Sequence, residues 1–144
     1  MMIKVVLDAN QYVSALLKPG SKPDRVFQLV QQKEIHLLLS PKILSELRRV
    51  LLYPKLTKIH QRTTQQIDNL LEKIARIAEI TPGKLLLEAI EDDPTDNKCL
   101  ECAIEGGADF IVSGDSHLTS LTSFRGVKIV TPNIFLKLVQ KSLA

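Results

Sequence analysis

Four acidic residues stand where their side chains could share one site: Asp8, Glu46, Asp96 and Asp115. Asp8 directly follows a run of apolar residues, and Asp115 follows another such run after a single glycine. Carboxylates that converge repel one another, so they stay ionised together only beside a compensating positive charge. A divalent cation held by oxygen ligands supplies that charge and acts on phosphate groups. The pattern therefore favours metal-dependent chemistry on a phosphate.

Each of these acids also has a structural interpretation when it is taken alone. Glu46 lies on the border of the apolar stripe of a predicted helix, one turn before Arg49, and such a surface pair contributes at most about 0.5 kcal/mol. Asp96 falls in the first turn of another predicted helix, where carboxylates often cap the helix or interact with its dipole. Asp96 is nevertheless in line with the apolar stripe of that helix, where an unpaired carboxylate is costly. Because all four acids stand at matching ends of elements, a shared site is the favoured interpretation.

The elements that must position these acids follow from the hydrophobic pattern. Short apolar runs predict strands at 3–7, 36–39, 78–80, 110–113 and 127–130. Helical spacing predicts helices at 11–17, 24–33, 41–52, 95–105, 116–121 and 133–141, and one that begins at residue 63 or 64. Ser21 and Ser40 are suitable N-caps, and Pro41 suits the first helical position. Strands that alternate with helices predict right-handed β-α-β units, a mostly parallel sheet and helices on both faces.

The expected fold gives Asp8 and Asp115 a common location. In open α/β sheets, ligands bind beyond the carboxyl ends of the strands. Both residues follow a predicted strand, so both lie at that edge if the two strands are neighbours.

Length and composition indicate one ordinary globular domain spanning residues 1–144. Hydrophobic residues make up 44% and charged residues 24% of the chain, which is typical of soluble proteins. No segment approaches the roughly 18 apolar residues that a membrane helix needs. The apolar run that ends at Leu7 is too short for a signal peptide, so we expect a cytoplasmic protein with no membrane segment.

The net charge of +3 hides an asymmetry between the two halves of the chain. Residues 1–62 carry a balance of +7, whereas residues 63–144 carry −4. Between residues 42 and 62 the only acid is Glu46, and the six basic residues are Lys42, Arg48, Arg49, Lys55, Lys58 and Arg62. This segment is either a solvated helical face or a surface that contacts a phosphate backbone, and Lys42, Arg48 and Arg49 are the candidate RNA-binding residues.

Cys99 and Cys102 form a lone C-x-x-C motif within a predicted helix. The chain has only these two cysteines, so it cannot build a four-cysteine zinc site by itself. We favour small buried hydrophobic side chains over a redox pair.

Several short runs, taken in order, resemble the PIN-domain family. They are Val-Leu-Asp-Ala-Asn at 6–10, Leu-Ser-Pro at 39–41 followed by Glu46, Asp-Pro-Thr-Asp-Asn-Lys at 93–98, and Ser-Gly-Asp at 113–115. Over its whole length the chain is similar to small prokaryotic single-domain members, the VapC toxins of toxin–antitoxin systems. The resemblance implies a Rossmann-like α/β/α sandwich with about five strands. It also implies a Mg²⁺- or Mn²⁺-dependent ribonuclease, a protein antitoxin as partner and a homodimer.

The resemblance also implies which residues form the site. The family's catalytic and metal-binding acids correspond to Asp8, Glu46, Asp96 and Asp115. Asn10 and Ser113 match its polar neighbours, and Asp93 is a further polar candidate near the site. Many members have Thr or Ser where this chain has Ala9, which removes one hydrogen-bonding group behind the acids.

Three residues near the expected site have less defined roles. Asp92 and Asp93 could help to bind a second metal ion or could belong to a solvated acidic loop. His117 follows Asp115 closely and is expected at the rim of the cleft.

Two other functional classes stay open on the sequence alone. A phosphatase of the haloacid-dehalogenase type also has an Asp after its first strand, but it needs a second Asp where this chain has Asn10. A catalytically silent RNA- or partner-binding module would account for the basic segment but not for four acids. DNA is as open as RNA, since nothing in the sequence visibly reads a 2′-hydroxyl.

Overall fold

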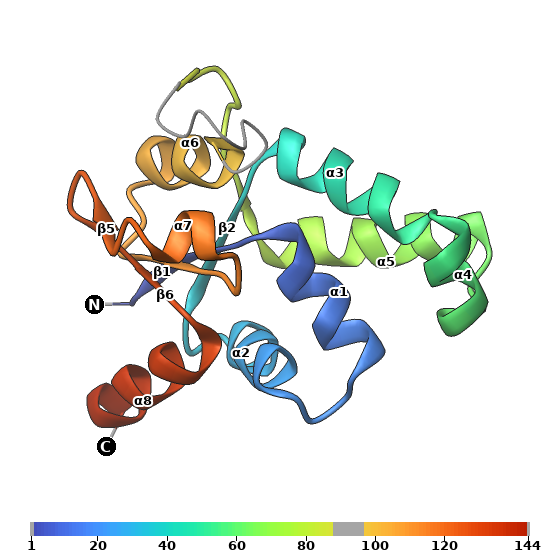
Figure 1. Ribbon diagram of the computed structural model, residues 1–144, viewed down its shortest axis with the longest axis horizontal. Coiled ribbons are helices and arrows are strands. Elements are labelled where there is room, and N and C mark those ends of the chain that lie inside the picture. Colours follow the sequence, from blue (N-terminus) through green and yellow to red (C-terminus); the bar gives the residue numbers. More distant parts are fainter. Residues whose placement is uncertain (1, 88–96, 144) are drawn as a thin grey trace.

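The computed structural model describes residues 2–87 and 97–143 and contains a six-stranded sheet (Figure 1). The strand order is β3-β2-β1-β4-β6-β5, and every neighbouring pair is parallel except β5 with β6. The strands are β1 (Lys4–Leu7), β2 (His36–Leu39), β3 (Glu79–Ile80), β4 (Phe110–Val112), β5 (Ser123–Phe124) and β6 (Val127–Val130). The mostly parallel sheet confirms the predicted fold class.

Helices cover both faces of this sheet. Figure 1 shows α6 above the sheet, α2 and α8 below it, and α3, α4 and α5 extending to the right. The helices are α1 (Ala9–Leu17), α2 (Lys22–Gln31), α3 (Pro41–Leu51), α4 (Pro54–His60), α5 (Thr64–Ile77), α6 (Asn97–Gly106), α7 (Ser116–Thr119) and α8 (Pro132–Leu143). The chain therefore has the three-layer α/β/α arrangement that the alternating elements predicted.

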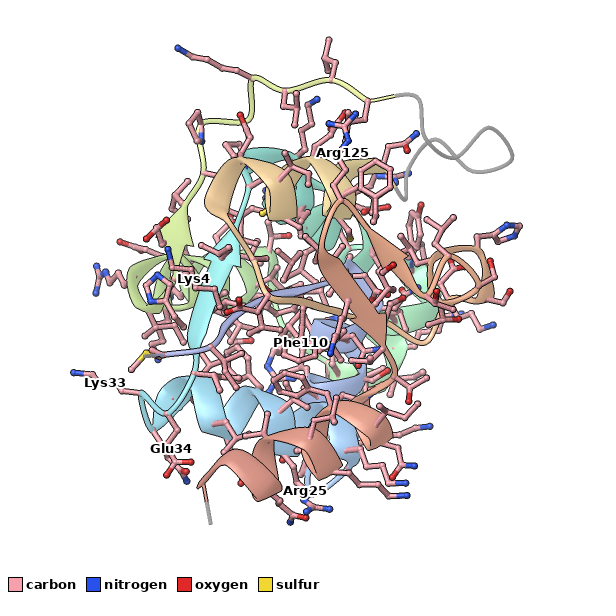
Figure 2. The ribbon with its side chains drawn as sticks, turned by 90° about the vertical axis from the view of Figure 1, so that its left-hand side faces the viewer. Lys4, Arg25, Lys33, Glu34, Phe110 and Arg125 are labelled. Carbon is pink, nitrogen blue, oxygen red and sulfur yellow. The ribbon has the colours of Figure 1, made fainter. Side chains whose placement is uncertain are left out.

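The central strands are apolar on both faces because helices bury both. Val5 and Val6 of β1 and Ile111 of β4 have no exposed surface. Figure 2 shows Lys4 and Phe110, at the starts of β1 and β4, on the side that lies to the left in Figure 1. The ring of Phe110 packs edge-to-face on Phe135 of α8, with 5.4 Å between ring centroids. This core fixes the depth and direction of the strands that end at the candidate site.

Side-chain caps place the helix starts where the sequence predicted them. The hydroxyl groups of Ser21 and Ser40 accept backbone N–H groups of α2 and α3, with Pro41 at the first helical position of α3. Thr63 forms a reciprocal capping box with Gln66 at the start of α5. These caps satisfy backbone donors that would otherwise lack a partner.

The structure adds two elements that the sequence pattern did not predict. One is α4, which begins at Pro54 because proline is compatible with the first helical turn. The other is β5, which makes six strands rather than five. It pairs with β6 through a tight turn in which both Arg125 and Gly126 have positive φ.

Two further expectations concern cysteine and membranes. Cys99 and Cys102 are buried in α6 and form no disulfide, as predicted, and burial raises the pKa of the Cys102 thiol to about 11. This thiol therefore stays protonated at neutral pH and is a poor nucleophile. Within residues 2–87 and 97–143, no helix is long and apolar enough to cross a membrane.

Candidate active site

The carboxyl ends of β1 and β4 bring Asp8 and Asp115 to one edge of the sheet. The two strands are parallel neighbours, and Leu7 is in register with Val112. The backbone N–H of Asp8 continues the pairing by donating to the carbonyl of Val112 at 3.3 Å. The chain then turns into α1 and α7, which are N-capped by Asp8 and Asp115. Neighbouring strands thus hold the two acids close, as the sequence predicted.

Ser113 joins the two acids directly. Its hydroxyl donates a hydrogen bond to the carboxylate of Asp8 and accepts one from the backbone N–H of Asp115 at 2.9 Å. Ser113 is fully buried, so its hydroxyl makes these two hydrogen bonds out of contact with solvent. We call Asp8, Ser113 and Asp115 the acid pair with its serine link. The arrangement fixes the orientation of the Asp8 carboxylate.

Burial dominates the electrostatics of Asp8, which is only 7% exposed. Desolvation raises the pKa of its carboxyl group, and the negative charge of Asp115 adds to that effect. Hydrogen bonds from Ser113 and from the backbone of Gln11 oppose it without cancelling it. The ionised carboxylate therefore lacks full compensation from the protein. Hard oxygen donors with an uncompensated charge fit a divalent cation such as Mg²⁺ or Mn²⁺.

Glu46 reaches the site region from α3, which begins directly after β2. Its side chain is about 20% exposed and lies 3.8 Å from Arg49 and 4.0 Å from Lys98 of α6. These residues line a cleft of about 320 Å³ between the starts of α3 and α6. Glu46 is thus compensated by two cations, whereas Asp8 is not.

The part of the chain that the structure describes contains no group of three His, Cys, Asp or Glu side chains placed to hold a metal ion. Of the predicted acids, the structure brings Asp8 and Asp115 together and places Glu46 in the neighbouring cleft. Asp96, together with Asp92 and Asp93, lies outside the described residues. The predicted metal site with four acids therefore stays a prediction.

The three predicted RNA-binding residues do not share one face of α3. Lys42 and Arg49 line the cleft beside Glu46, and Lys42 also donates to Glu101 at 3.3 Å. Arg48 instead forms a two-pronged pair with Asp68 of α5, at 2.7 and 3.4 Å. Residues two apart on a helix point about 200° apart, so Arg48 faces away from Glu46.

Two residues at the site were missed at the sequence level. Gln11 is buried beside Asp8, and its Oε1 is without a hydrogen-bond partner among the described residues. Lys98 reaches Glu46 across the cleft from the first turn of α6. The position of Gln11 in the first turn after Asp8 was the available signal, whereas Lys98 needed the tertiary packing of α6 on α3.

Asn10, predicted as a polar neighbour, and His117, predicted at the rim, are both exposed. Asn10 projects from the first turn of α1, and its backbone rather than its side chain contributes to the surroundings of Asp8. His117 is exposed in α7, where its backbone N–H donates to Asp115 at 2.7 Å. This position agrees with the expected place at the rim.

Fold and site together define a mostly parallel α/β domain with a carboxylate pair, of which Asp8 is buried and Asp115 is partly exposed, at the carboxyl edge of its strands. The family model of the PIN domain matches residues 4–117, which include β1, β4, Asp8 and Asp115. The chain belongs to the PIN-domain family, as its sequence motifs predicted. The match covers both strands of the acid pair and all of α3 and α6.

Sequence and structure comparisons agree with this family. The chain is similar to an uncharacterized protein, MJ1680, of Methanocaldococcus jannaschii, with 29% identity over 150 aligned positions. The alignment covers 99% of this chain and 95% of that protein. The fold of the present chain is similar to a chain in the structure of VapBC2 from Rickettsia felis, which is bound to a DNA fragment from the VapBC2 promoter. The TM-score is 0.60 at 16% identity, and the match covers 88% of this chain and 97% of that chain. The fold is also similar to PAE2754 from Pyrobaculum aerophilum, with TM-score 0.60, 14% identity and coverage of 96% and 90%. At these identities the two structures establish a shared fold.

Proposed function

We propose that this protein is a metal-dependent endoribonuclease that hydrolyses RNA phosphodiester bonds with Mg²⁺ or Mn²⁺. The observation that carries this proposal is the acid pair with its serine link, a buried and undercompensated carboxylate site at the ligand-binding edge of a PIN domain. The family match supports a nuclease, and the metal and the substrate are our inference from the donor set and the surrounding charge.

The protein's own side chains have distinct tasks in this proposal. Asp8 and Asp115 would hold the cation, and Ser113 fixes the orientation of the Asp8 carboxylate through its hydrogen bond. Glu46 and Asp96 complete the set, Glu46 either as a ligand or by orienting the attacking water. When bound, the divalent cation supplies charge stabilisation to the phosphate and lowers the pKa of water.

A second group of side chains attracts the substrate. Lys42, Arg49 and Lys98 surround Glu46 and give the cleft more positive than negative charge. A polyanion is drawn to such a cleft, whereas the acids alone would repel it. We assign Arg48 no part in this contact, because its charge is paired with Asp68 on the other flank of α3.

The test is cleavage of a labelled mixed-sequence RNA by the purified protein with Mg²⁺ or Mn²⁺, and with EDTA. Asp8→Asn keeps an N-cap for α1 but removes the charge, and Asp96→Asn tests the acid known only from the sequence motif. We expect both variants to lose more than about a hundredfold in activity, a larger effect than the 10- to 100-fold typical of residues behind metal ligands. Asp68→Asn is the matched control, because Asp68 is an exposed carboxylate paired with Arg48 away from the site.

Each outcome separates the functional classes. Cleavage that needs both metal and Asp8 supports the nuclease, whereas full activity of Asp8→Asn overturns the assignment. RNA binding without cleavage in any condition favours the silent binding module instead. A trapped phosphoaspartate would favour a phosphatase, although Asn10 stands where that chemistry needs a second Asp.

The fold similarity to VapBC2 supports a further part of the proposal, that the nuclease is the toxin of a toxin–antitoxin pair. In that case a small protein antitoxin binds and inhibits it, and the toxin forms a homodimer. Growth arrest on expression of the wild type but not of Asp8→Asn tests the toxin activity, and the mass of the purified protein in solution tests the homodimer.

A further inference from the structure

Four residues form a continuous stripe along one side of α3, and we call them the α3 ridge: Lys42, Glu46, Arg49 and Tyr53. Their spacings of four, three and four residues keep them on the same helical face. Tyr53 lies just beyond the last residue of α3, and the intervening Leu52 still has right-handed helical angles. The ridge therefore runs from the first turn of α3, at the sheet edge where β2 ends, outward to the start of α4, along the helix that extends to the right in Figure 1.

The inner part of the α3 ridge is positively charged. The cleft beside it is lined by Pro41, Lys42, Ser45, Glu46, Arg49 and Lys98. Lys42 also pairs with Glu101, so three cations stand against two carboxylates and the balance stays positive. The side chains of Lys42, Arg49 and Lys98 are 36%, 58% and 26% exposed, so all three are available to solvent and to a ligand. This surface is complementary in charge to a phosphate backbone.

Arg49 connects the charged and aromatic parts of the ridge. One guanidinium nitrogen donates to the hydroxyl of Tyr53 at 3.1 Å, and the other terminal nitrogen lies 3.8 Å from the carboxylate of Glu46. The guanidinium is thus held between the two residues. It carries five N–H donors, more than these two contacts use, so it retains donors for a phosphate oxygen.

Tyr53 is an exposed aromatic ring on a rigid corner. It is 45% exposed, although a ring of this size is more often covered. Its backbone N–H donates to Val50 at 3.1 Å, and its carbonyl accepts from Leu56 and Thr57 at 2.9 Å each. Pro54 follows as the first residue of α4 and fixes the chain direction. The backbone that carries the ring is therefore held in place, and the hydrogen bond from Arg49 to the hydroxyl restrains the ring, which lowers the ordering needed on binding.

We propose that the α3 ridge binds single-stranded RNA beside the reaction site, with phosphates on Lys42, Arg49 and Lys98 and one base stacked on Tyr53. This inference rests on the proposed function for the identity of the ligand. A base stacks on an aromatic side chain only when it is unpaired, which selects single strands over duplexes. At 1.5 Å per residue, Tyr53 lies about 10 Å along α3 from Glu46, so the stacked base is separate from the reacting phosphate.

The affinity for a fluorescent single-stranded RNA of about 12 nucleotides can be measured by fluorescence anisotropy. EDTA in the buffer removes the metal, so the RNA is bound but not cleaved. Tyr53→Ala is expected to weaken binding about tenfold, and Tyr53→Phe, which keeps the ring, to stay within about twofold of the wild type. Arg49→Ala should weaken binding and reduce the slope of log affinity against log salt by about 0.7, the value for one phosphate on a single strand. Arg48→Ala is the matched control on the same helix and should leave affinity unchanged, because Arg48 pairs with Asp68 on the other flank.

An RNA with abasic sites along its length tests stacking itself. The wild type should bind this probe about as weakly as Tyr53→Ala binds the normal RNA, and Tyr53→Ala should bind both RNAs alike. Equal affinities of wild type and Tyr53→Ala for the normal RNA would overturn the inference. Absence of measurable RNA binding by the wild type, or equal effects of Arg48→Ala and Arg49→Ala, would overturn it as well.

The outcome is distinguishable from that of the proposed function. If binding depends on Tyr53 but no metal supports cleavage, the ridge stands and the nuclease fails. If metal-dependent cleavage occurs but neither the affinity nor KM changes in Tyr53→Ala, the nuclease stands and the ridge fails.

Discussion

The acid pair with its serine link and the α3 ridge lie in the same region but are held by different forces. Asp8 and Ser113 are buried at the ends of two packed strands, and the charge of the Asp8 carboxylate is not fully compensated. Glu46 and Arg49 are partly exposed, and they pair with each other across one helical turn. The acid pair has one geometry because paired strands hold the backbone on which its side chains stand. The α3 ridge is adjustable because its long side chains at the surface can change conformation.

This difference assigns the two regions different tasks. A catalytic site needs carboxylates held in one geometry, and the register of β1 on β4 provides it. A surface that follows a flexible polyanion needs charges that can reorient, and exposed Lys and Arg side chains provide them. Variants at Ser113, Gly106 and Asp8 test the buried, fixed region, and the variants at Arg48, Arg49 and Tyr53 test the exposed, adjustable one.

Among these three predictions, the largest effect is expected at Ser113. Ser113→Ala removes the hydrogen bond to Asp8 and the acceptor for the backbone N–H of Asp115. We expect a 10- to 100-fold loss of metal affinity or of kcat/KM, the usual effect of removing a group that orients a metal ligand. Metal titration of cleavage, with unfolding curves to show that the fold is intact, measures it. Ser116→Ala is the matched control, because Ser116 is exposed in α7. If both variants cleave like the wild type, the serine link has no functional importance.

The packing behind the site can be perturbed without changing a charge. A Cβ atom on Gly106 would lie 2.6 Å from Cδ1 of Leu38, which is fully buried in β2. Gly106→Ala is therefore expected to lower the free energy of unfolding by about 1–3 kcal/mol, as measured by urea denaturation. The double variant Gly106→Ala with Leu38→Val should lose less unfolding free energy than the sum of the losses in the two single variants. Additive losses would show that the two side chains do not collide.

Asp8→Asn is expected to stabilise the metal-free protein, by less than Gly106→Ala destabilises it. Folding raises the pKa of Asp8, so the folded state binds more protons than the unfolded state as the pH passes above about 3.9. The free energy of unfolding therefore falls as the pH rises through the folded pKa, and ionised Asp8 destabilises the protein at neutral pH. Asp8→Asn should raise Tm at pH 7, and the gain should disappear below about pH 4.

Two controls accompany this measurement. Mg²⁺ or Mn²⁺ should raise the Tm of the wild type and have much less effect on Asp8→Asn, because a ligand stabilises only the state that binds it. Asp68→Asn should lower Tm at pH 7, because Arg48 lowers the pKa of Asp68 and so favours its ionised form in the folded state. A lower Tm for metal-free Asp8→Asn at pH 7 would contradict the electrostatic interpretation of the acid pair.

Most of the fold could be predicted from the sequence because strong local signals agreed with it. Apolar runs marked the strands His36–Leu39 and Val127–Val130 at their observed bounds, and Ser40 with Pro41 marked the start of α3. The elements that were missed have weak local signals. Tyr53 makes no side-chain cap for α4, and the two-residue β5 depends on a turn at Arg125 and Gly126 without the usual Asn-Gly or Asp-Gly sequence.

The candidate site divides in the same way. Asp8 and Asp115 could be placed together from the sequence because each follows a buried strand of a parallel sheet. The different fates of Arg48 and Arg49 could not, because adjacent basic residues look alike in a sequence and only the packing of α5 on α3 supplies Asp68 to one of them. Lys98 was missed for the same reason, since its contact with Glu46 joins residues that are distant in the chain.

The sequence by itself determined the class of fold, the family and the order of its acidic residues, because hydrophobic period, caps and short motifs are local properties of the chain. Only the tertiary structure decided which charges are compensated. Burial at the strand ends leaves Asp8 undercompensated, while helix packing neutralises Arg48 and leaves Arg49 beside an exposed Tyr53. Compensation depends on distance and dielectric surroundings in three dimensions, and neither is a property of position along the chain.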